Sequence, residues 1–408
     1  MNSRTDLSRR RILAAGSGAL AAAGLAGASR VAAQTTPAAP AAASQAKPLP
    51  AYVAWKDADS LIVHTPTTIE TKRTAFGSSI ITPAERLFIR NNLPAPDVAI
   101  VANRDAWQMA VDGVRQPGTL TVADLKTLGL ETIATVLQCS GNGRSYFPTK
   151  PAGTRWQAGA AGCVLWSGVP VRAVAQALGG PNNGMRFITG TGGEALPAGV
   201  DPKTVIVERS VPIGTLDDAL LAWEMNGEPL PHAHGGPLRL IIPGYSGVNN
   251  IKYVKRLAFT ADQTDAAIQR TGYRMTPPGT KGDPSFPAVW EMDPKSWITS
   301  PAPEAGAAKR GWVQIYGVAM GGMQAPRRVE VSLDGGKTWT DASFIGPNLG
   351  RYAWRPFVLQ TQLKPGGYLI ASRVTDSQGR VQVESTPDNA GGYLNSGWRA
   401  HAVQVTVA

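Results

Sequence analysis

The hydrophobic pattern of the chain changes near residue 300, and this change limits the folds that the chain can adopt. Before it, short β-type runs alternate with helix-like stretches, which is typical of an α+β fold. After it, residues 305–408 contain only short β-type runs separated by turn residues, a pattern that favours an immunoglobulin-like sandwich. A Pro-containing stretch, Met275 to Pro303, separates the two parts. The sequence therefore predicts two domains, 51–300 and 301–408.

The apolar runs give the positions of the expected elements. In the first domain we expect strands at Thr132–Leu137, Met185–Thr189, Val205–Val207 and Leu238–Ile242, and helices at Val169–Leu178 and Leu216–Trp223. In the second domain we expect strands at Trp312–Val318, Arg328–Leu333, Phe357–Gln362 and Leu369–Asp376. The glycine-rich stretch Thr189–Gly193 lacks the spacing of a nucleotide-binding loop, so we interpret it as a turn. Asp334-Gly335-Gly336 predicts a tight turn between two strands.

The N-terminal segment has the composition of a targeting signal. Ser8-Arg9-Arg10-Arg11 precedes an Ala/Gly/Leu-rich stretch, and Val31-Ala32-Ala33 offers small residues for cleavage. The pattern resembles a twin-arginine signal, so we expect residues 1–33 to be removed and the folded protein to be exported to the periplasm. An uncleaved amphipathic helix is the alternative, which the glycine-rich composition disfavours. Residues 34–50 are rich in Ala, Pro, Thr and Gln and predict a flexible lead-in.

The net charge of +11 narrows the choice of partners. Residues 1–33 carry five arginines and one aspartate, so their removal leaves a charge of about +7. A basic protein suits an anionic substrate or an acidic partner. The chain has no run of Lys and Arg and no nucleic-acid-binding motif, so we expect no nucleic-acid partner. No apolar run of membrane-spanning length follows the N-terminal segment, so we expect no membrane helix in the mature protein.

The chain contains two cysteines, Cys139 and Cys163. Cys139 follows a short apolar run and precedes a Gly/Asn turn, which places its thiol at the end of a buried strand, where it could meet a soft metal. A buried structural cysteine is the alternative, because a free cysteine packs like a small hydrophobe. Cys163 has apolar neighbours and is predicted to be a buried, inert thiol. The chain has no Cys-x-x-Cys-His sequence, so it holds no covalent c-type haem.

Five stretches, in this order, resemble motifs of the sulfite oxidase family of molybdenum enzymes. They are Phe88–Pro94, Val136–Arg144, Ala222–Gly227, His234–Lys252 and Ser332–Gly336. The similarity covers roughly residues 75–405. It implies a molybdopterin-binding core, a molybdenum-molybdopterin cofactor and an immunoglobulin-like domain that the family uses for dimer contact. No cytochrome b5-like domain is visible, so we expect no haem in this chain.

The resemblance also assigns roles around the cofactor. Cys139 corresponds to the family's metal ligand, and a thiolate is a suitable ligand for a soft metal. His234, Arg239 and Lys252 correspond to residues that anchor the pterin and its terminal phosphate, which need ring hydrogen bonds and positive charge. Further cofactor contacts are expected from Phe88, Arg90, Asn91, Asn92, Asn250 and Ile251.

The substrate pocket is assigned in the same way. Arg90 and Arg144 match two family arginines, and a guanidinium fork binds two oxyanion oxygens at once. Trp156 corresponds to a tryptophan that walls the pocket, although a core aromatic is the alternative. Tyr273 stands at the spacing of the family's active-site tyrosine, whose phenol could hydrogen-bond the substrate or gate protons. Tyr245 is a weaker candidate for that role.

Two positions depart from the family pattern. Asn92 stands where the family has a histidine, and an amide does not titrate near neutral pH. Gly391 stands where the family's third sulfite-binding arginine is expected, and Arg399 is nearby but out of register. Loss of one charged hydrogen bond weakens the binding of a small dianion by ~1–3 kcal/mol.

The sequence thus predicts a periplasmic, molybdenum-dependent sulfite dehydrogenase that passes electrons to a separate c-type cytochrome, in a homodimer. The catalytic subunit of a sulfane dehydrogenase is an alternative, which the missing arginine favours. A sulfoxide reductase of the same cofactor family is another, which the C-terminal β domain disfavours. An exported binding protein without cofactor is a third, which the retained Cys139, His234, Arg239 and Lys252 disfavour.

Overall fold

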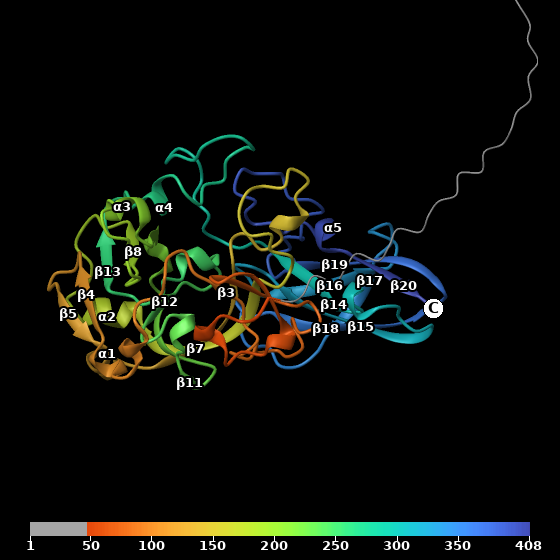
Figure 1. The fold of residues 1–408 in the computed structure, drawn as a ribbon, viewed down its shortest axis with the longest axis horizontal. Helices are drawn as coiled ribbons and strands as arrows, with labels where there is room; N and C mark the ends of the chain where they lie inside the picture. Colours follow the sequence, from red (N-terminus) through yellow and green to blue (C-terminus); the bar gives the residue numbers. More distant parts are fainter. Residues whose placement is uncertain (1–46) are drawn as a thin grey trace, which may run out of the picture. The chain divides into compact units, whose positions relative to one another are not determined.

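The computed structural model describes residues 47–408, which belong to one compact unit. The predicted signal segment, residues 1–33, and most of the predicted lead-in, residues 34–50, lie outside the described residues. Within the described part of the chain, no helix is both long and apolar enough to cross a membrane. Four sheets, connected by long loops and short helices, make up the fold (Figure 1).

Three sheets form the N-terminal part, which has the mixed α and β character that the sequence predicts. The first sheet has the order β1 (Leu61–Thr65), β2 (Thr68–Thr71), β3 (Ile89–Arg90). The second has the order β11 (Glu228–Pro229), β10 (Leu220–Met225), β7 (Ala161–Pro170), β6 (Glu131–Gln138), with β12 (Arg239–Ile241) paired to β10. The third has the order β5 (Gly118–Thr121), β4 (Gln108–Asp112), β13 (Arg256–Thr260), β8 (Phe187–Thr191), β9 (Glu208–Pro212). The short helices are α1 (Val122–Thr127), α2 (Val171–Ala177), α3 (Pro202–Val205) and α4 (Ala267–Arg270).

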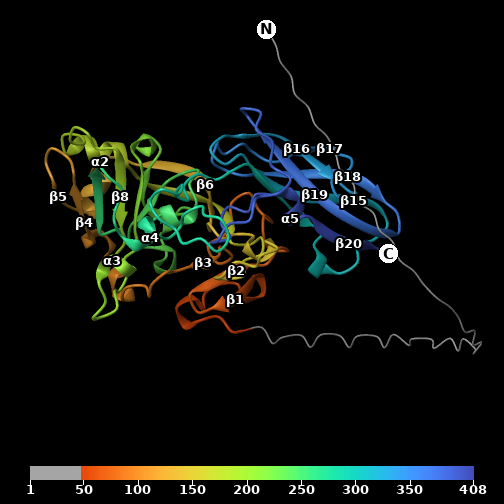
Figure 2. The same cartoon turned by 90° about the horizontal axis from the view of Figure 1, so that it is seen from above.

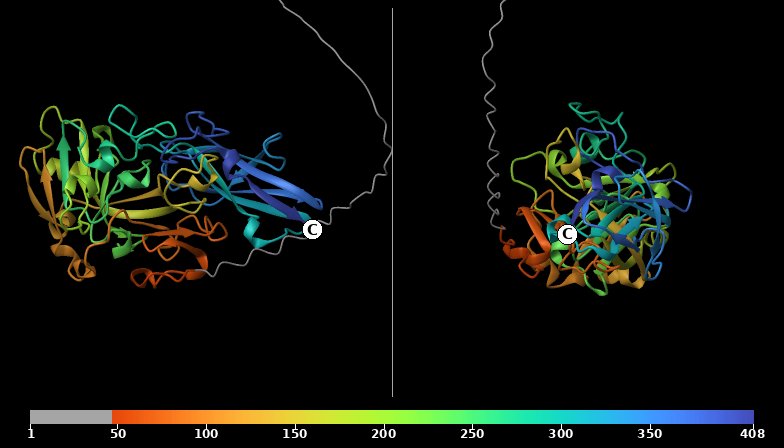
Figure 3. Two further views of the ribbon diagram at one scale, coloured as in Figure 1. Left: turned by 45° about the horizontal axis from the view of Figure 1, so that its top comes forward. Right: turned by 90° about the vertical axis from the view of Figure 1, so that its right-hand side faces the viewer.

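The C-terminal part is built on one seven-stranded antiparallel sheet, drawn from cyan to blue in Figures 2 and 3. Its order is β14 (Lys295–Ser300), β15 (Gly311–Met320), β18 (Arg355–Leu363), β17 (Thr340–Phe344), β16 (Pro326–Ser332), β19 (Gly366–Asp376), β20 (Val403–Val407). Helix α5 (Trp398–His401) precedes the last strand. The sheet folds over so that β14 faces β19, where the Ser296 and Ser372 hydroxyls lie 2.9 Å apart. This confirms the expected immunoglobulin-like architecture, and its first strand begins before the predicted boundary at residue 301.

The helix predicted at Leu216–Trp223 is wrong, because its first half is a turn and its second half, from Leu220, belongs to strand β10. The strand lies inside its sheet, between β7 and β12, and nearly all of its residues are buried. A strand that is buried on both faces reads as a continuous apolar run, which a short helix segment also produces. The period of the pattern therefore could not separate the two structures.

Two smaller predictions also fail in the third sheet. The turn predicted at Thr189–Gly193 is mostly strand, because β8 continues to Thr191. Its glycine allows close packing, since a Cβ at Gly190 would lie 2.7 Å from the Leu240 side chain. The strand predicted at Val205–Val207 is instead the end of α3 and a short link to β9.

Strand β6 carries the chain from the surface into the core. Glu131 is exposed, whereas the residues from Ala134 to Gln138 are buried. Over its whole length β6 pairs with β7, where Cys163 lies opposite Val136. Cys163 is a free cysteine with no exposed surface, and burial raises the pKa of its thiol to about 12. The thiol therefore stays protonated, as expected of an inert buried cysteine.

Candidate active site

Cys139 directly follows β6, at the point where the strand ends in the core. Its backbone N–H donates to the Ala160 carbonyl at 2.8 Å, and its carbonyl accepts from the Asn142 N–H at 2.9 Å. The side chain is 8% exposed and carries a free thiol. The strand end and the following turn thus present one sulfur atom to the space beyond the sheet.

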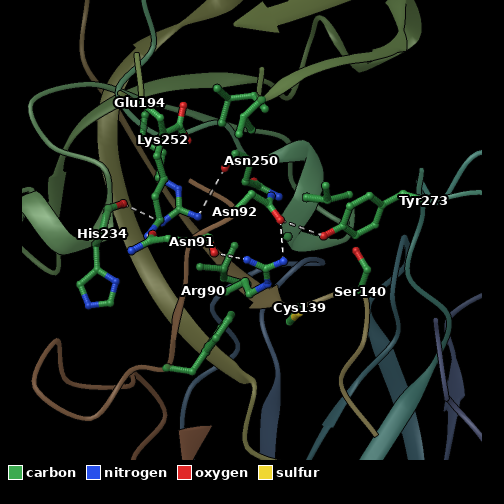
Figure 4. A pocket seen from close by; sticks show the side chains of 17 residues that line it. Arg90, Asn91, Asn92, Cys139, Ser140, Glu194, His234, Asn250, Lys252 and Tyr273 are labelled. Carbon is green, nitrogen blue, oxygen red and sulfur yellow. Dashed lines mark hydrogen bonds between the residues drawn. The ribbon is translucent and has the colours of Figure 1, made fainter. Parts of the chain in front are cut away.

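That space is a cavity, which we name the first cavity (Figure 4). It brings together eleven residues that the sequence singled out. They are Phe88, Arg90, Asn91, Asn92, Cys139, His234, Arg239, Asn250, Ile251, Lys252 and Tyr273. These residues come from segments far apart in the sequence, so their convergence supports the motif assignments as a set.

Positive charge is concentrated on one side of the first cavity. The Arg239 guanidinium donates from Nη1 to the His234 carbonyl at 2.8 Å, and the Lys252 ammonium donates to Asn91 Oδ1 at 2.6 Å. Burial, together with the neighbouring Arg239, lowers the pKa of Lys252 well below its ordinary value. Burial likewise lowers the pKa of Arg239 to about 10, and that of the His234 imidazole well below its ordinary value. Burial thus disfavours the charged form of each group, and for Lys252 and His234 the neighbouring cations act in the same direction.

The polar atoms of the first cavity fit a molybdopterin. Arg239 Nε is buried and has no hydrogen-bond partner among the described residues, and neither has Glu194 Oε2. A phosphate would neutralise the cations of Arg239 and Lys252, and a pterin ring offers N–H donors to a carboxylate such as Glu194. Cys139 supplies the soft ligand that molybdenum needs. The residues present therefore suit a ligand with an anionic tail, hydrogen-bonding rings and a metal.

Two residues of this region were not predicted from the sequence. Glu194 lines the first cavity, and burial raises the pKa of its carboxyl to about 7. Lys56 is 5% exposed, and its charge contributes, after burial, to the lowered pKa of His234. Glu194 follows two glycines, and Lys56 lies far from every recognised motif, so no local pattern indicated either of them.

A second cavity opens beside Cys139 and shares five lining residues with the first: Arg90, Asn91, Asn92, Cys139 and Tyr273. It is lined by Thr65, Thr67, Thr68, Arg90, Asn91, Asn92, Cys139, Gly141, Arg144, Ala152, Gly153, Thr154, Tyr273 and Tyr393. Arg144 donates from Nε to the Gly391 carbonyl at 2.9 Å and from Nη1 to the Thr154 carbonyl at 3.1 Å. These bonds fix the guanidinium and leave Nη2 without a protein partner among the described residues.

Arg90 and Tyr273 meet at Asn92, between the two cavities (Figure 4). Asn92 Oδ1 accepts from Arg90 Nη2 at 2.5 Å and from the Tyr273 hydroxyl at 3.5 Å. The amide at the position where the family has histidine thus orients both a cation and a phenol. The structure therefore places the predicted Arg90, Arg144 and Tyr273 around one space next to Cys139.

Three other candidates lie outside this space. Trp156 is fully buried and packs edge-on against Phe88 behind the cavities, so it supports the pocket without lining it. Tyr245 lies in a separate hydrophobic cluster, where burial and the nearby Glu291 raise the pKa of its phenol to about 12. Arg399 is exposed and pairs with Glu384, so it does not replace the missing arginine.

Comparison with known proteins shows the family to which the chain belongs. Residues 94–268 match the oxidoreductase molybdopterin binding domain, and residues 286–407 match the Mo-co oxidoreductase dimerisation domain. The chain is 32% identical over 340 residues to the sulfite oxidase of Gallus gallus, covering 78% of this chain and 72% of that protein. It is 29% identical over 360 residues to the sulfite oxidase of Arabidopsis thaliana, covering 82% of this chain and 90% of that protein. It spans 62% of the length of the mitochondrial sulfite oxidase of Homo sapiens, at 30% identity over 352 residues and 80% coverage of this chain.

Among solved structures, the sulfane dehydrogenase SoxCD from Paracoccus pantotrophus is similar to this chain. The TM-score is 0.71 at 26% sequence identity, and the match covers 85% of this chain and 88% of that chain. Sequence and structure thus agree over both parts of the molecule, and the cavity beside Cys139 fits the cofactor of the group. The chain belongs to the sulfite oxidase family of molybdopterin-binding oxidoreductases.

Proposed function

We propose that this protein oxidises sulfite to sulfate in the periplasm and passes the electrons to a separate c-type cytochrome. The observation that carries the proposal is the convergence of Arg90, Arg144 and Tyr273 on one cavity beside Cys139. In the net reaction, water supplies the added oxygen atom, and two protons and two electrons are released. Two molecules of a one-electron cytochrome accept the electrons.

The bound cofactor would supply a metal that accepts an electron pair and returns it in single-electron steps. The protein's own groups do the remaining work. Arg90 and the free Nη2 edge of Arg144 bind the oxygens of the anion, and charged hydrogen bonds of this kind fix both position and orientation. The Tyr273 hydroxyl, which donates to Asn92 Oδ1, can exchange that bond for one to the substrate. Cys139 holds the metal, and His234, Arg239, Lys252 and Glu194 hold the pterin and its phosphate.

Other features support the proposed export, the homodimer and the electron acceptor. The twin-arginine pattern within residues 1–33 supports export of the folded protein, which suits a protein that must acquire a complex cofactor before export. The match of residues 286–407 to a dimerisation domain supports a homodimer. A basic mature chain suits both an anionic substrate and an acidic electron acceptor.

The direct test is sulfite-dependent reduction of ferricyanide or cytochrome c by the purified mature protein, with molybdenum quantified in the same sample. Turnover with about one metal atom per chain is the expected result. Full molybdenum content without sulfite turnover would contradict sulfite as the substrate, while the assignment of the cofactor would stand. Metal-free protein from native export would contradict the proposed enzyme itself.

A sulfane dehydrogenase is the second candidate. Two observations favour it: Gly391 in place of a third arginine, and the structural similarity to the sulfane dehydrogenase SoxCD. This candidate predicts that the metal-loaded protein oxidises protein-bound sulfane sulfur faster than it oxidises sulfite. If protein with the same molybdenum content oxidised sulfite faster than sulfane sulfur, the sulfane dehydrogenase would be excluded.

A further inference from the structure

Gly391 and Tyr393 compete for the same space. A Cβ built at Gly391 would lie 2.0 Å from Cε2 of the Tyr393 ring and 2.5 Å from Cδ2. The ring of Tyr393 thus occupies the volume that any side chain at position 391 needs. The family pattern has an arginine at position 391. In this chain the ring of Tyr393, two residues later, takes the space of that side chain.

The backbone around Tyr393 holds the ring in that place. Asn389 Oδ1 accepts from the Tyr393 N–H at 2.8 Å, and Asn389 Nδ2 donates to the Tyr393 carbonyl at 3.0 Å. The next residue, Leu394, has a positive φ of 52° and donates its N–H to the Ser140 carbonyl at 2.8 Å. The segment is therefore clamped against the residue that follows Cys139, and the ring cannot easily leave the second cavity.

Tyr393 is also part of a four-layer stack. Its ring lies 5.0 Å from the Tyr273 ring at an interplanar angle of 19°. The Arg144 guanidinium lies 5.6 Å from the Tyr393 ring centre, and the Arg209 guanidinium lies 5.7 Å from the Tyr273 ring centre. Both contacts are within the range of cation–π attraction, so each end of the tyrosine pair is covered by a cation.

Arg209 cannot act as the missing substrate-binding arginine. It is 1% exposed, and its guanidinium donates to the Ile268 carbonyl at 2.7 Å, to the Val289 carbonyl at 3.3 Å and to Asn249 Oδ1 at 3.2 Å. Neither Arg209 nor any of these partners lines the second cavity. The second cavity therefore offers its substrate two guanidinium groups, from Arg90 and Arg144, and an aromatic wall in place of the third.

Such a pocket suits an anion of lower charge than sulfite. Two guanidinium groups can bind the two oxygens of a single anionic group. The faces of the Tyr393 ring are covered by Tyr273 and by the Arg144 guanidinium, so the ring presents its edge to the cavity. A ring edge attracts a polarisable group such as sulfur, and the ring supplies no cation for a second negative charge. A dianion would leave its second charge facing the ring.

We propose that Tyr393 is the specificity-determining residue of the second cavity, and that it makes the enzyme prefer monoanionic sulfur oxyanions of the form R–SO2⁻, with R apolar, over dianionic sulfite. The substrate class is an organic sulfinate. The reaction converts R–SO2⁻ and water to R–SO3⁻, two protons and two electrons: one S–O bond forms, the R–S bond stays intact, and two equivalents of a one-electron acceptor such as ferricyanide are reduced. This proposal rests on the proposed function, since it assumes oxidation of a sulfur anion at this site.

The test compares sulfite with methanesulfinate as substrates of the molybdenum-loaded holoenzyme. The variants are Tyr393→Phe, Tyr393→Ala and the double variant Gly391→Arg/Tyr393→Ala, in which the arginine gains the space of the ring. Tyr368→Phe serves as control, because the Tyr368 hydroxyl contacts only the backbone of Lys364. In the double variant, kcat/KM for sulfite relative to methanesulfinate should rise at least about tenfold, through KM, as expected for one added charged hydrogen bond. Tyr393→Phe should keep the ratio of the native enzyme, because the ring is retained.

A binding measurement separates this proposal from the proposed function. Sulfate is a dianion and methanesulfonate is a monoanion, and titration calorimetry of each against the holoenzyme needs no turnover. The native enzyme should bind methanesulfonate more tightly, and the double variant should reverse the order. Native protein that binds sulfate more tightly, or a folded, metal-loaded double variant with an unchanged ratio, would overturn the role of Tyr393. Absence of turnover with both substrates, with the expected order of binding, would contradict only the proposed function.

Discussion

The buried ammonium of Lys56 predicts how the stability of the cofactor-free protein depends on pH. Its Nζ donates to the Ala84 carbonyl at 2.5 Å and to the Leu87 carbonyl at 2.8 Å. Burial lowers its pKa from the ordinary value of 10.5 to about 7, and Glu85 offsets this only in part. Between these two values the unfolded chain binds more protons at this site than the folded protein does. Stability therefore rises with pH across this window.

The size of the effect follows from the shift. Each pKa unit corresponds to about 1.4 kcal/mol. The lowered pKa of Lys56 therefore reduces the free energy of unfolding by roughly 4 kcal/mol at pH 7 and by under about 1 kcal/mol at pH 10. We expect Lys56 alone to add about 3 kcal/mol to the free energy of unfolding between pH 7 and pH 10. Lys56→Met keeps an apolar stem of similar length and removes the titrating group. It also leaves two carbonyls unpaired, but that cost is the same at both pH values.

The measurement is urea unfolding of the cofactor-free protein at pH 7 and pH 10, at equal ionic strength, for the native protein and the variant. The difference between the two pH responses isolates Lys56 from all other groups that titrate. Lys309→Met, at an exposed position, is the matched control and should retain the native response. Equal pH responses in native protein and Lys56→Met would refute the reasoning, because the lysine would then have the same pKa in the folded and unfolded states.

Three substitutions test the site directly. Cys139→Ser should lose molybdenum and sulfite turnover with the circular dichroism spectrum unchanged, because an alcohol is a poor ligand for a soft metal; unchanged turnover would contradict the ligand assignment. Arg90→Gln should raise KM for sulfite about tenfold or more, the worth of one charged hydrogen bond; an unchanged KM would remove Arg90 from the substrate pocket. Arg239→Met should lower the molybdenum retained after gel filtration, because a buried cation that a phosphate would neutralise is lost; full retention would show that the phosphate lies elsewhere.

Most of the residues that the sequence identified belong to a short stretch that resembles a family motif, whereas Trp156 and Tyr273 lie outside the five stretches. Cys139 and Arg144 lie on one turn, and His234, Arg239 and Lys252 lie within one 19-residue stretch, so local geometry is nearly enough to bring each group together. The five stretches occur in the same order as the family motifs, and this order indicated the fold. In the C-terminal part, short β-type runs and turn residues predicted four strands, and the structure adds β14, β17 and β20 to them.

The residues that the sequence missed act across long separations. Lys56 and Glu194 reach the site only through the tertiary fold, and nothing in their neighbours indicates this. Tyr393 follows the aligned position Gly391 by two residues, but only the structure shows that its ring lines the second cavity. Strand β10 was missed for a different reason, because a strand buried on both faces loses the alternation that identifies a strand. Local patterns thus predict which residues bear the chemistry, whereas the surrounding charge and packing require the structure.

The clearest case is the return of the C-terminal chain to the metal-binding loop. After β19, the segment before α5 donates from Leu394 N to the Ser140 carbonyl and from Asn395 Nδ2 to the Gly143 carbonyl, and it accepts from Arg144 Nε at Gly391. These three bonds span the turn that follows Cys139. The C-terminal part therefore orients Arg144 and supplies a wall of the second cavity, in addition to any role in dimer contact. All residues that line the first cavity precede this segment in the chain, so the segment contributes a side chain to the second cavity alone.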